Sequence, residues 1–481
     1  MNLASVTHDL AFMTPELVIA VGAMLLVLMG AFVSKSAYRA ITYLSVVVLL
    51  VAGFLGVQHA PDNAQVLFNG SYVVDAFGGF AKLIIALTAA CAILLSADYL
   101  AERNLEKPEY PVLALLAVLG MYVMVSAHDL LAVYMGVELQ SLALYVLAAY
   151  ARDDRKSSEA GLKYFVLGAL SSGILLYGVS LIYGFTGTIN FGKLMTIAKD
   201  TSNVGLIFGM VFVLSGIAFK MSVAPFHMWT PDVYEGAPTP STAFFATAPK
   251  MAAAILLGRF LFEAFGEVVS QWRDVVSIMA VLSMFVGAIF ALQQTNMKRL
   301  LAYSSILNMG YAMVAIAAGP VYGPSALLLF TAIYAITSVG MFGVLLSMRD
   351  AKGKEITKIS GYSGLSKQRP LLSLALTIMF FSITGIPPLL GFFGKFQIFI
   401  AAVDGGVMPL ALILVIASVI SAFYYLRVLK VVWFDEPSVE IVGGLATTKV
   451  TVTGVTLMIA LLTPFIGLIY TASMAAGHFF K

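Results

Sequence analysis

The sequence predicts an all-α, polytopic membrane protein with about 14 transmembrane helices. Of its 481 residues 60% are hydrophobic and only 11% are charged, and the mean hydropathy is +0.95. Apolar stretches long enough to cross a hydrocarbon core of roughly 30 Å at 1.5 Å per residue recur from one end of the sequence to the other. No water-soluble domain needs so much apolar surface, so the solvent around this chain is expected to be lipid.

The predicted spans follow one another with short connections. The first lacks a basic leader and a small-residue cleavage site, so we expect a retained helix rather than a signal peptide. The longest polar connection, residues 349–370, is too short to fold alone. In order, the spans are 16–33, 40–57, 74–96, 110–127, 129–149, 160–184, 204–229, 239–265, 272–293, 298–318, 325–348, 371–402, 407–433 and 449–471.

Two spans are interrupted by glycine and proline beside a lysine. Span seven has Lys220 followed by Pro225, and span twelve has Pro387 and Pro388 before Lys395. Proline lacks a backbone donor and leaves a carbonyl without its partner, and lipid does not satisfy such groups. Each interruption therefore indicates a hydrated cavity inside the protein, although a simple kink remains the alternative.

The two interruptions are five spans apart, and an odd separation inverts one unit relative to the other across the membrane. Interrupted helices at matching places in inverted halves are typical of secondary transporters. We therefore expect two inverted five-helix repeats, spans 4–8 and 9–13. The corresponding segments are an N-terminal three-helix part at 1–109, the repeats at 110–268 and 269–435, and a C-terminal helix at 436–481.

The basic residues favour one side of the membrane. Loops after odd-numbered spans carry 18 Lys and Arg residues, from Lys35 to Lys449, whereas the other side carries 4, which are Lys193, Lys199, Arg273 and Lys481. Cytoplasmic loops are enriched in Lys and Arg. Both termini are therefore predicted to lie outside the cytoplasm.

The sequence offers no local sign of a redox or metal centre. The single cysteine, Cys91, lies in an apolar span and is too few for an iron–sulfur cluster. The histidines follow no metal-ligand spacing. They are His8, His59, His128, His227 and His478.

Six basic residues fall inside predicted spans. A lysine at the bilayer centre costs about 2.5–3.5 kcal/mol on insertion scales, so each needs a partner or a purpose. Lys82 and Arg259 lie within about two turns of a span end and are interpreted as anchors or packing groups. Lys163 lies near the start of span six and is open to either interpretation.

Lys220, Lys250 and Lys395 lie deep within their spans or beside a break, and we expect them to act on protons. Glu138 is the one acidic residue near the middle of a span, and it is the candidate partner of Lys220. A charge pair at ~4 Å in an effective dielectric of ~20 interacts by about 4 kcal/mol, enough to hold or release a proton. His227 is either a proton relay or a histidine bonded near the interface.

At these residues the chain resembles the antiporter-like membrane subunits of respiratory complex I, and most closely the N-type members. The specific segments are 219–240 (FKMSVAPFHMWTPDVYEGAPTP) and 384–395 (TGIPPLLGFFGK), and PDVYEGAP at 231–238 is N-like. The resemblance implies that Glu138, Lys220, Lys250 and Lys395 carry protons, with Lys163 in support. Lysine rather than glutamate at 395, and the lack of a long lateral helix after span fourteen, also favour the N type.

The resemblance further implies a proton-translocating subunit of NADH:quinone oxidoreductase that has no cofactor of its own. Flavin mononucleotide and iron–sulfur clusters would be held by other subunits, and quinone would be a substrate of the whole complex. The implied partners are the M, K, J, A and H membrane subunits, the peripheral arm and lipids, with no nucleic acid. The implied location is the bacterial inner membrane.

Two other functions fit the same residues. A cation/proton antiporter subunit of the Mrp type would use the same lysines and broken helices, and sodium efflux without quinone would distinguish it. A membrane scaffold would use the buried charges only for assembly, so neutralising Lys395 would impair assembly and pumping together.

Overall fold

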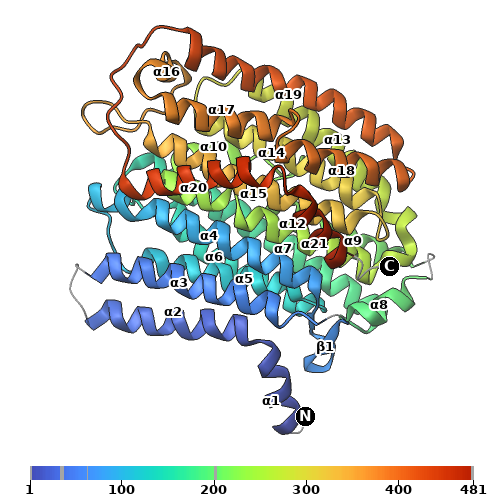
Figure 1. Ribbon diagram of the computed structural model, residues 1–481. Coiled ribbons are helices and arrows are strands. Elements are labelled where there is room, and N and C mark those ends of the chain that lie inside the picture. Colours follow the sequence, from blue (N-terminus) through green and yellow to red (C-terminus); the bar gives the residue numbers. More distant parts are fainter. Residues whose placement is uncertain (1–2, 33–36, 62, 200–202, 478–481) are drawn as a thin grey trace.

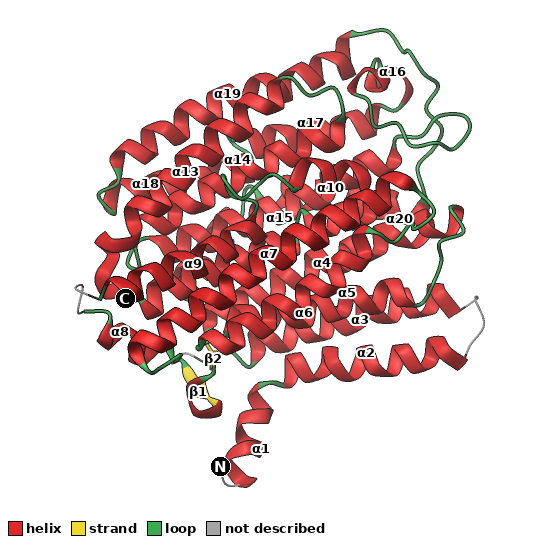
Figure 2. Cartoon of the chain, turned by 180° about the vertical axis from the view of Figure 1, so that it is seen from behind, coloured by secondary structure: helices red, strands yellow, loops and turns green. Residues whose placement is uncertain are grey.

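The computed structural model describes residues 3–32, 37–61, 63–199 and 203–477. Lys35, His478 and Lys481 lie outside the described residues. Figures 1 and 2 show a bundle of long, nearly parallel helices, with one small hairpin as the sheet structure of the described part. This confirms the predicted all-α class.

The chain begins with helices that pack on one edge of the bundle. The first elements are α1 (Leu3–Phe12), α2 (Thr14–Phe32), α3 (Ala37–Gln58), β1 (Gln65–Leu67), η1 (Phe68–Gly70), β2 (Tyr72–Val74) and α4 (Ala76–Glu102). The two strands form an antiparallel hairpin in which Val66 pairs with Val73. The hairpin was not predicted, because its strands are only three residues long.

The next segment contains the first interrupted helix. Its elements are α5 (Glu109–Ser126), α6 (Leu130–Ala148), α7 (Arg155–Thr186), α8 (Phe191–Ile197), α9 (Val204–Met221), α10 (Thr230–Gly236), α11 (Thr239–Phe245), α12 (Ala248–Arg259), the π-helical turn η2 (Phe260–Ala264) and η3 (Gly266–Val268).

The remaining segment contains the second interrupted helix. Its elements are α13 (Val269–Leu292), α14 (Met297–Ala317), α15 (Gly323–Ser347), η4 (Ile359–Tyr362), α16 (Leu365–Gln368), α17 (Pro370–Thr384), α18 (Leu390–Asp404), α19 (Met408–Phe434), α20 (Ala446–Leu462) and α21 (Ile466–Gly477). The last two helices return along α15 and α4 (Figure 1).

In the described residues 12 helical segments are long and apolar enough to cross a membrane. Two shorter apolar helices, α17 and α20, occupy the places of predicted spans twelve and fourteen. The total of fourteen and the pairing into inverted repeats stay predictions.

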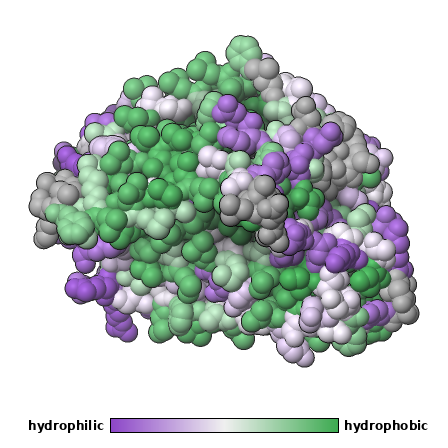
Figure 3. Space-filling model, turned by 90° about the horizontal axis from the view of Figure 1, so that it is seen from below, coloured by the Kyte–Doolittle hydropathy of each residue, from purple (hydrophilic) through white to green (hydrophobic). Residues whose placement is uncertain are grey.

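Burial separates a core from a lipid-facing shell. The membrane-spanning window is 94% buried in α14 and α15 but 28% buried in α2. The exposed side chains of α2 include Met24, Leu25 and Leu28, and Figure 3 shows a broad apolar surface on the side of the molecule where α2 lies. Helices that are apolar all round belong inside, so α14 and α15 form the centre.

The helices end at two opposite faces of the bundle, the basic end and the hairpin end. The basic end carries the loops 103–108, 149–154 and 348–369, and the hairpin end carries β1, β2 and α8 (Figure 1).

Both predicted helix interruptions are present. Helix α9 ends at Met221 and α10 begins at Thr230, and α17 ends at Thr384 before α18 begins at Leu390. Each helix closes on a left-handed residue, Ser222 with φ 64° and Gly385 with φ 89°. The capping N–H groups bond back to the last turn, but carbonyls beyond that turn remain free for side chains.

A third interruption was not predicted. The segment expected as the single span 239–265 is two helices, because Thr247 between α11 and α12 has φ −120° and ψ −97°. Helix α12 begins at Ala248 and has Pro249 in its first turn, where proline is favoured because an N–H there would have no partner within the helix. Lys250 therefore lies in a first turn rather than in mid-helix.

Candidate functional site

Lys220 lies in the last turn of α9, 4% exposed. Its Nζ donates to the Tyr145 hydroxyl of α6 at 3.1 Å and lies 5.5 Å from the ring centres of Tyr145 and Phe219. The ammonium is thus held by a neutral hydroxyl and aromatic faces.

Glu138 does not form the predicted direct pair with Lys220. Among the ion pairs of the described residues, none within 4.0 Å joins the two. The Glu138 Oε1 atom is buried without a hydrogen-bond partner. The hydrogen-bond partner of Lys220 is instead Tyr145, seven residues further along α6. A tyrosine in an apolar helix resembles ordinary packing, so little in the sequence pointed to it.

Lys250 lies at the start of α12 and reaches the end of the first broken helix. Its Nζ donates to the Met221 carbonyl at 3.0 Å and to the Ser222 hydroxyl. It also lies 5.1 Å from the Trp229 ring centre. A helix C-terminus has a partial negative charge and free carbonyls, which suit a cation. It is Lys250, rather than Lys220, that uses the carbonyl at the first break.

Lys395 repeats this arrangement at the second break. It lies in α18, 7% exposed, and its Nζ donates to the carbonyl of Thr384, the last residue of α17, at 2.9 Å. A longer contact of 3.4 Å reaches the Ser418 hydroxyl, and the Tyr311 ring centre is 4.7 Å away. At both breaks a freed carbonyl therefore binds a lysine from another helix.

Hydroxyl groups occupy the core between Lys250 and Lys395. Tyr234 of α10 lies 5.8 Å from Lys250 Nζ, ring centre to nitrogen, and its hydroxyl is buried without a partner. The other groups lie on α14, α15 and α19. The bonds join Tyr334 to Ser305 (2.8 Å), Ser304 to Tyr425, and Ser418 to Tyr311 (3.0 Å). We call these groups, with Tyr234, the hydroxyl row.

Among the described residues no hydrogen bond joins His227 to a lysine. Its side chain lies in the loop between α9 and α10, half-buried, with Nδ1 lacking a hydrogen-bond partner. Neighbouring Pro225 is exposed, and Met228 is 76% exposed. The loop of this break therefore reaches the surface of the chain. Pro387 and Pro388 lie at the second break, between α17 and α18.

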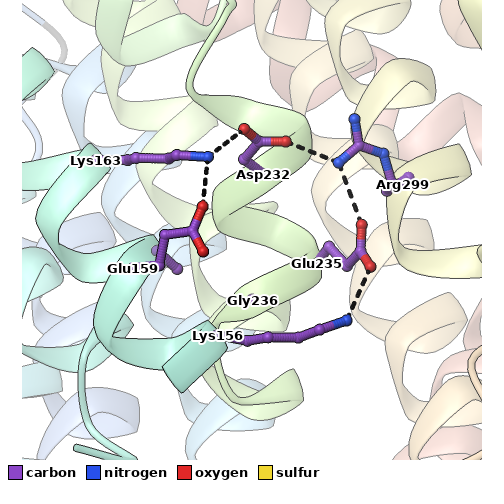
Figure 4. Close-up of a pocket in the computed structure, with 8 residues that line it drawn as sticks. Lys156, Glu159, Lys163, Asp232, Glu235, Gly236 and Arg299 are labelled. Carbon is purple, nitrogen blue, oxygen red and sulfur yellow. Dashed lines mark hydrogen bonds and ion pairs between the residues drawn. The ribbon is translucent and has the colours of Figure 1, made fainter. Parts of the chain in front are cut away.

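Lys163 belongs to a separate ionic network at the basic end. Its Nζ lies 2.8 Å from both Glu159 and Asp232. Arg299 bridges Asp232 (2.8 Å) and Glu235 (3.2 Å), and Lys156 completes the row (Figure 4). These residues line a cavity of about 160 Å³ that opens at the surface. The predicted supporting lysine is thus paired with carboxylates at this opening and does not join the deep lysines.

Asp232 is held ionised within this network. Burial raises the pKa of its carboxyl, but the hydrogen bonds from Lys163 and Arg299 outweigh burial and hold the pKa below its ordinary value.

Helix α10 links this network to the deep site. It carries Asp232 at the cavity, and its first residue, Thr230, donates to the Ser222 hydroxyl at 2.6 Å. The Ser222 hydroxyl also accepts a hydrogen bond from Lys250 Nζ. This seven-residue helix therefore contacts both the surface cavity and, through Ser222, the buried Lys250.

Lys82 and Arg259, the other two basic residues expected inside spans and found buried, have carboxylate partners near the hairpin end. Lys82 Nζ lies 2.7 Å from Glu16. Arg259 bonds Asp75 at 2.8 Å and also Glu263, whose second oxygen bonds His128. These side chains are paired, in keeping with a packing role.

Broken helices whose free ends bind buried lysines, inside a lipid-facing bundle, define a class of ion-translocating membrane protein. Residues 127–421 match the family described as NADH:quinone oxidoreductase/Mrp antiporter, TM. The chain belongs to this family of membrane subunits.

Relatives and solved structures agree with this. NADH-quinone oxidoreductase subunit N of Maricaulis maris is 51% identical over 99% of both chains, and that of Parvibaculum lavamentivorans is 48% identical over 94% of both. A chain of respiratory complex I from Thermus thermophilus with bound aureothin matches with a TM-score of 0.82 and 30% identity, covering 96% of this chain and all of the other. A chain of the Mrp complex from Dietzia shares the fold, with a TM-score of 0.85 and 22% identity over 98% of both chains.

Proposed function

We propose that this chain translocates protons as the N-type membrane subunit of an NADH-quinone oxidoreductase. NADH oxidation and quinone reduction take place in other subunits, which hold flavin mononucleotide and iron–sulfur clusters. The partners are the M, K, J, A and H membrane subunits and the peripheral arm, in the bacterial inner membrane. The similarity to curated N subunits over nearly the whole chain supports this assignment.

One observation carries the proposal: three deeply buried lysines have only neutral partners. Lys220, Lys250 and Lys395 bond hydroxyl and carbonyl oxygens, and no ion pair among the described residues includes them. An isolated ammonium in a low-dielectric interior is costly, so the neutral amine is accessible and the proton is easily given up. Lys82, by contrast, has the carboxylate of Glu16. Lys298 is also buried with carbonyl partners, but it lies at the basic end, beside a cavity lined by the loops there.

The route begins at the basic end, which we infer faces the cytoplasm because cytoplasmic loops are enriched in Lys and Arg. Protons enter at the cavity around Asp232 and reach Lys250 along α10, whose Thr230 hydroxyl bonds Ser222. Lys250 and Lys220 form the first store, with Glu138 as the acidic group that draws the proton on or off Lys220.

From the first store the proton moves sideways along the hydroxyl row to Lys395. A hydroxyl group accepts one hydrogen bond while it donates another, so a proton advances along the row as these bonds switch. Water bridges the members of the row that do not bond each other. The unpartnered hydroxyl of Tyr234 is a place for such a water. Lys395 then releases the proton outside.

The test is Lys220→Ala in the assembled complex, in inverted membrane vesicles. We expect loss of NADH-driven proton uptake, while NADH oxidation by a soluble artificial acceptor, which bypasses the membrane arm, stays unchanged. Lys430→Ala is the matched control, because Lys430 is exposed and pairs with Asp435 at 2.5 Å. Normal proton pumping in Lys220→Ala would refute the proposal.

A cation/proton antiporter is the second candidate, favoured by the shared fold with the Mrp complex. The same lysines would then exchange protons for sodium. Sodium efflux from vesicles that contain this chain and lack quinone would support the antiporter, and co-purification with flavin-containing subunits would support the oxidoreductase.

A further inference from the structure

The hydroxyl of Tyr145 occupies the place where a direct pair between Lys220 and Glu138 was expected. It accepts a hydrogen bond from Lys220 Nζ at 3.1 Å, and the tyrosine is 6% exposed. The opposite group, Glu138 Oε1, is buried without a partner. A buried carboxylate oxygen without a hydrogen bond is costly, so it calls for a role.

Helix geometry directs the tyrosine toward that carboxylate. Glu138, Ser141 and Tyr145 stand at positions i, i+3 and i+7 of α6, so they share one face. Side chains of a helix tilt toward its N-terminus, and the Tyr145 ring therefore reaches back over the turn that carries Ser141. Ser141 is itself buried and lies between the two groups.

The packing around Tyr145 fixes its hydroxyl. Gly168 of α7 leaves the room for it, because a Cβ at that position would overlap the hydroxyl oxygen. Tyr164 packs edge-on against the ring, with centroids 4.9 Å apart, and stacks on Trp229, which faces Lys250. Three aromatic rings, those of Tyr145, Tyr164 and Trp229, therefore lie in contact from Lys220 to Lys250.

We propose that Tyr145 is the proton carrier between Lys220 and Glu138. This inference rests on the proposed function and names one of its steps. An N–H bond of the Lys220 ammonium breaks as its proton joins the Tyr145 oxygen, and the tyrosine's own proton leaves toward the Glu138 carboxylate through Ser141 or an adjacent water. The products are a neutral amine, an unchanged tyrosine and a neutral carboxylic acid, so the tyrosine never holds a net charge at either end of the step.

The first test is Tyr145→Phe in the assembled complex. The variant keeps the ring and its packing but removes the carrier oxygen, so NADH-driven proton uptake is expected to fall to the level of Lys220→Ala. Tyr164→Phe is the matched control, because it removes a hydroxyl from the neighbouring ring, which bonds neither lysine, and it is expected to pump normally. Wild-type pumping in Tyr145→Phe, or an equal loss in Tyr164→Phe, would overturn the inference.

A second test separates proton transfer from packing. Gly168→Ala pushes against the Tyr145 hydroxyl, so it should lower pumping in the native background. The added Cβ would also overlap Cζ and Cε1 of the ring, so Gly168→Ala should lower complex assembly as well, whereas Tyr145→Phe keeps the ring in place and should lower pumping with assembly unchanged. A fall in assembly in Tyr145→Phe that matches the fall in Gly168→Ala would mean that α6 and α7 packing is the cause and would refute the carrier role.

The two levels of the hypothesis fail differently. If Lys220→Ala abolishes pumping and Tyr145→Phe does not, only the carrier role is wrong. If Lys220→Ala pumps normally, the proposed function is wrong as well. Complex assembly on a native gel and NADH oxidation by the artificial acceptor identify any variant that fails for lack of the folded complex.

Discussion

At the scale of single residues, the partner of a buried cation indicates its role. Lys82 and Arg259 are as buried as the deep lysines, yet carboxylates neutralise them. Lys220, Lys250 and Lys395 have neutral oxygens only. A carboxylate within bonding distance keeps a cation charged, whereas a carbonyl or hydroxyl allows it to change state. The first kind of site favours stability, and the second favours proton transfer.

Removing Arg259 should therefore destabilise the chain. Arg259→Ala leaves Asp75 and Glu263 buried without their cation, and breaking one side of a buried ion pair costs about 3–5 kcal/mol. We expect a large fall in the amount of assembled complex and in its thermal midpoint. Lys430→Ala, at an exposed pair, should change little, because such pairs contribute roughly 0–1 kcal/mol.

A compensating variant tests the cause. Arg259→Met combined with Asp75→Asn and Glu263→Gln removes the uncompensated charges, so it should restore part of the lost stability. If it is as unstable as Arg259→Ala, the loss arises from the size and shape of the arginine and not from its charge.

At the scale of elements, each broken helix provides an acceptor for a lysine of another helix. The carbonyls of Met221 and Thr384 end α9 and α17, and they receive Lys250 and Lys395. The break at α17 depends on Gly385, whose φ of 89° is readily adopted only by glycine. A Cβ there would lie 3.1 Å from Cδ of Lys395.

Gly385→Ala is therefore expected to affect both stability and pumping. The left-handed conformation costs a residue with a Cβ about 1–2 kcal/mol, and the methyl group displaces Lys395 from the Thr384 carbonyl. Gly406→Ala is the control, because Gly406 has φ 75° but no atom lies within 4 Å of the place that a methyl group would take there. Both variants should lower the thermal midpoint similarly, and only Gly385→Ala should lower proton pumping. Equal pumping in the two would contradict the role of the Lys395 contact.

At the scale of the whole molecule, charge and shape distinguish the two ends. The network of Figure 4 opens at the basic end, and the ion pairs of Arg259 lie toward the hairpin end. The basic loops predict that the first of these faces the cytoplasm and that both termini lie outside. The proposed entry at Asp232 requires the same orientation.

Cysteine labelling tests this orientation. In a Cys91→Ala background, Arg152→Cys places a thiol on an exposed loop of the basic end, and Lys193→Cys places one on α8 at the hairpin end. A membrane-impermeant maleimide should label Lys193→Cys in intact spheroplasts and Arg152→Cys only in inverted vesicles. The reverse pattern would invert the chain and the proposed direction of entry.

Sequence patterns located the residues that are unusual for a membrane interior. Lys220, Lys250, Lys395 and Glu138 stand out because ionisable groups are rare in lipid. Tyr145 and the hydroxyl row did not stand out, because in apolar helices a tyrosine ring usually packs like any aromatic ring and a serine hydroxyl usually bonds a carbonyl of its own helix. The break before α12 was also missed, although Pro249 was a signal for it, because proline is favoured in the first turn of a helix.

The sequence by itself determined that the chain is a helical membrane protein, where two of its helices break, and which cations lie inside. Hydropathy and proline are local properties, so they can be read along the chain. Only the tertiary structure decided which group each cation meets: Tyr145 and not Glu138 for Lys220, a helix end for Lys250 and Lys395, and carboxylates for Lys82 and Arg259. Such partners come from helices distant in sequence, and their distances depend on how the whole bundle packs.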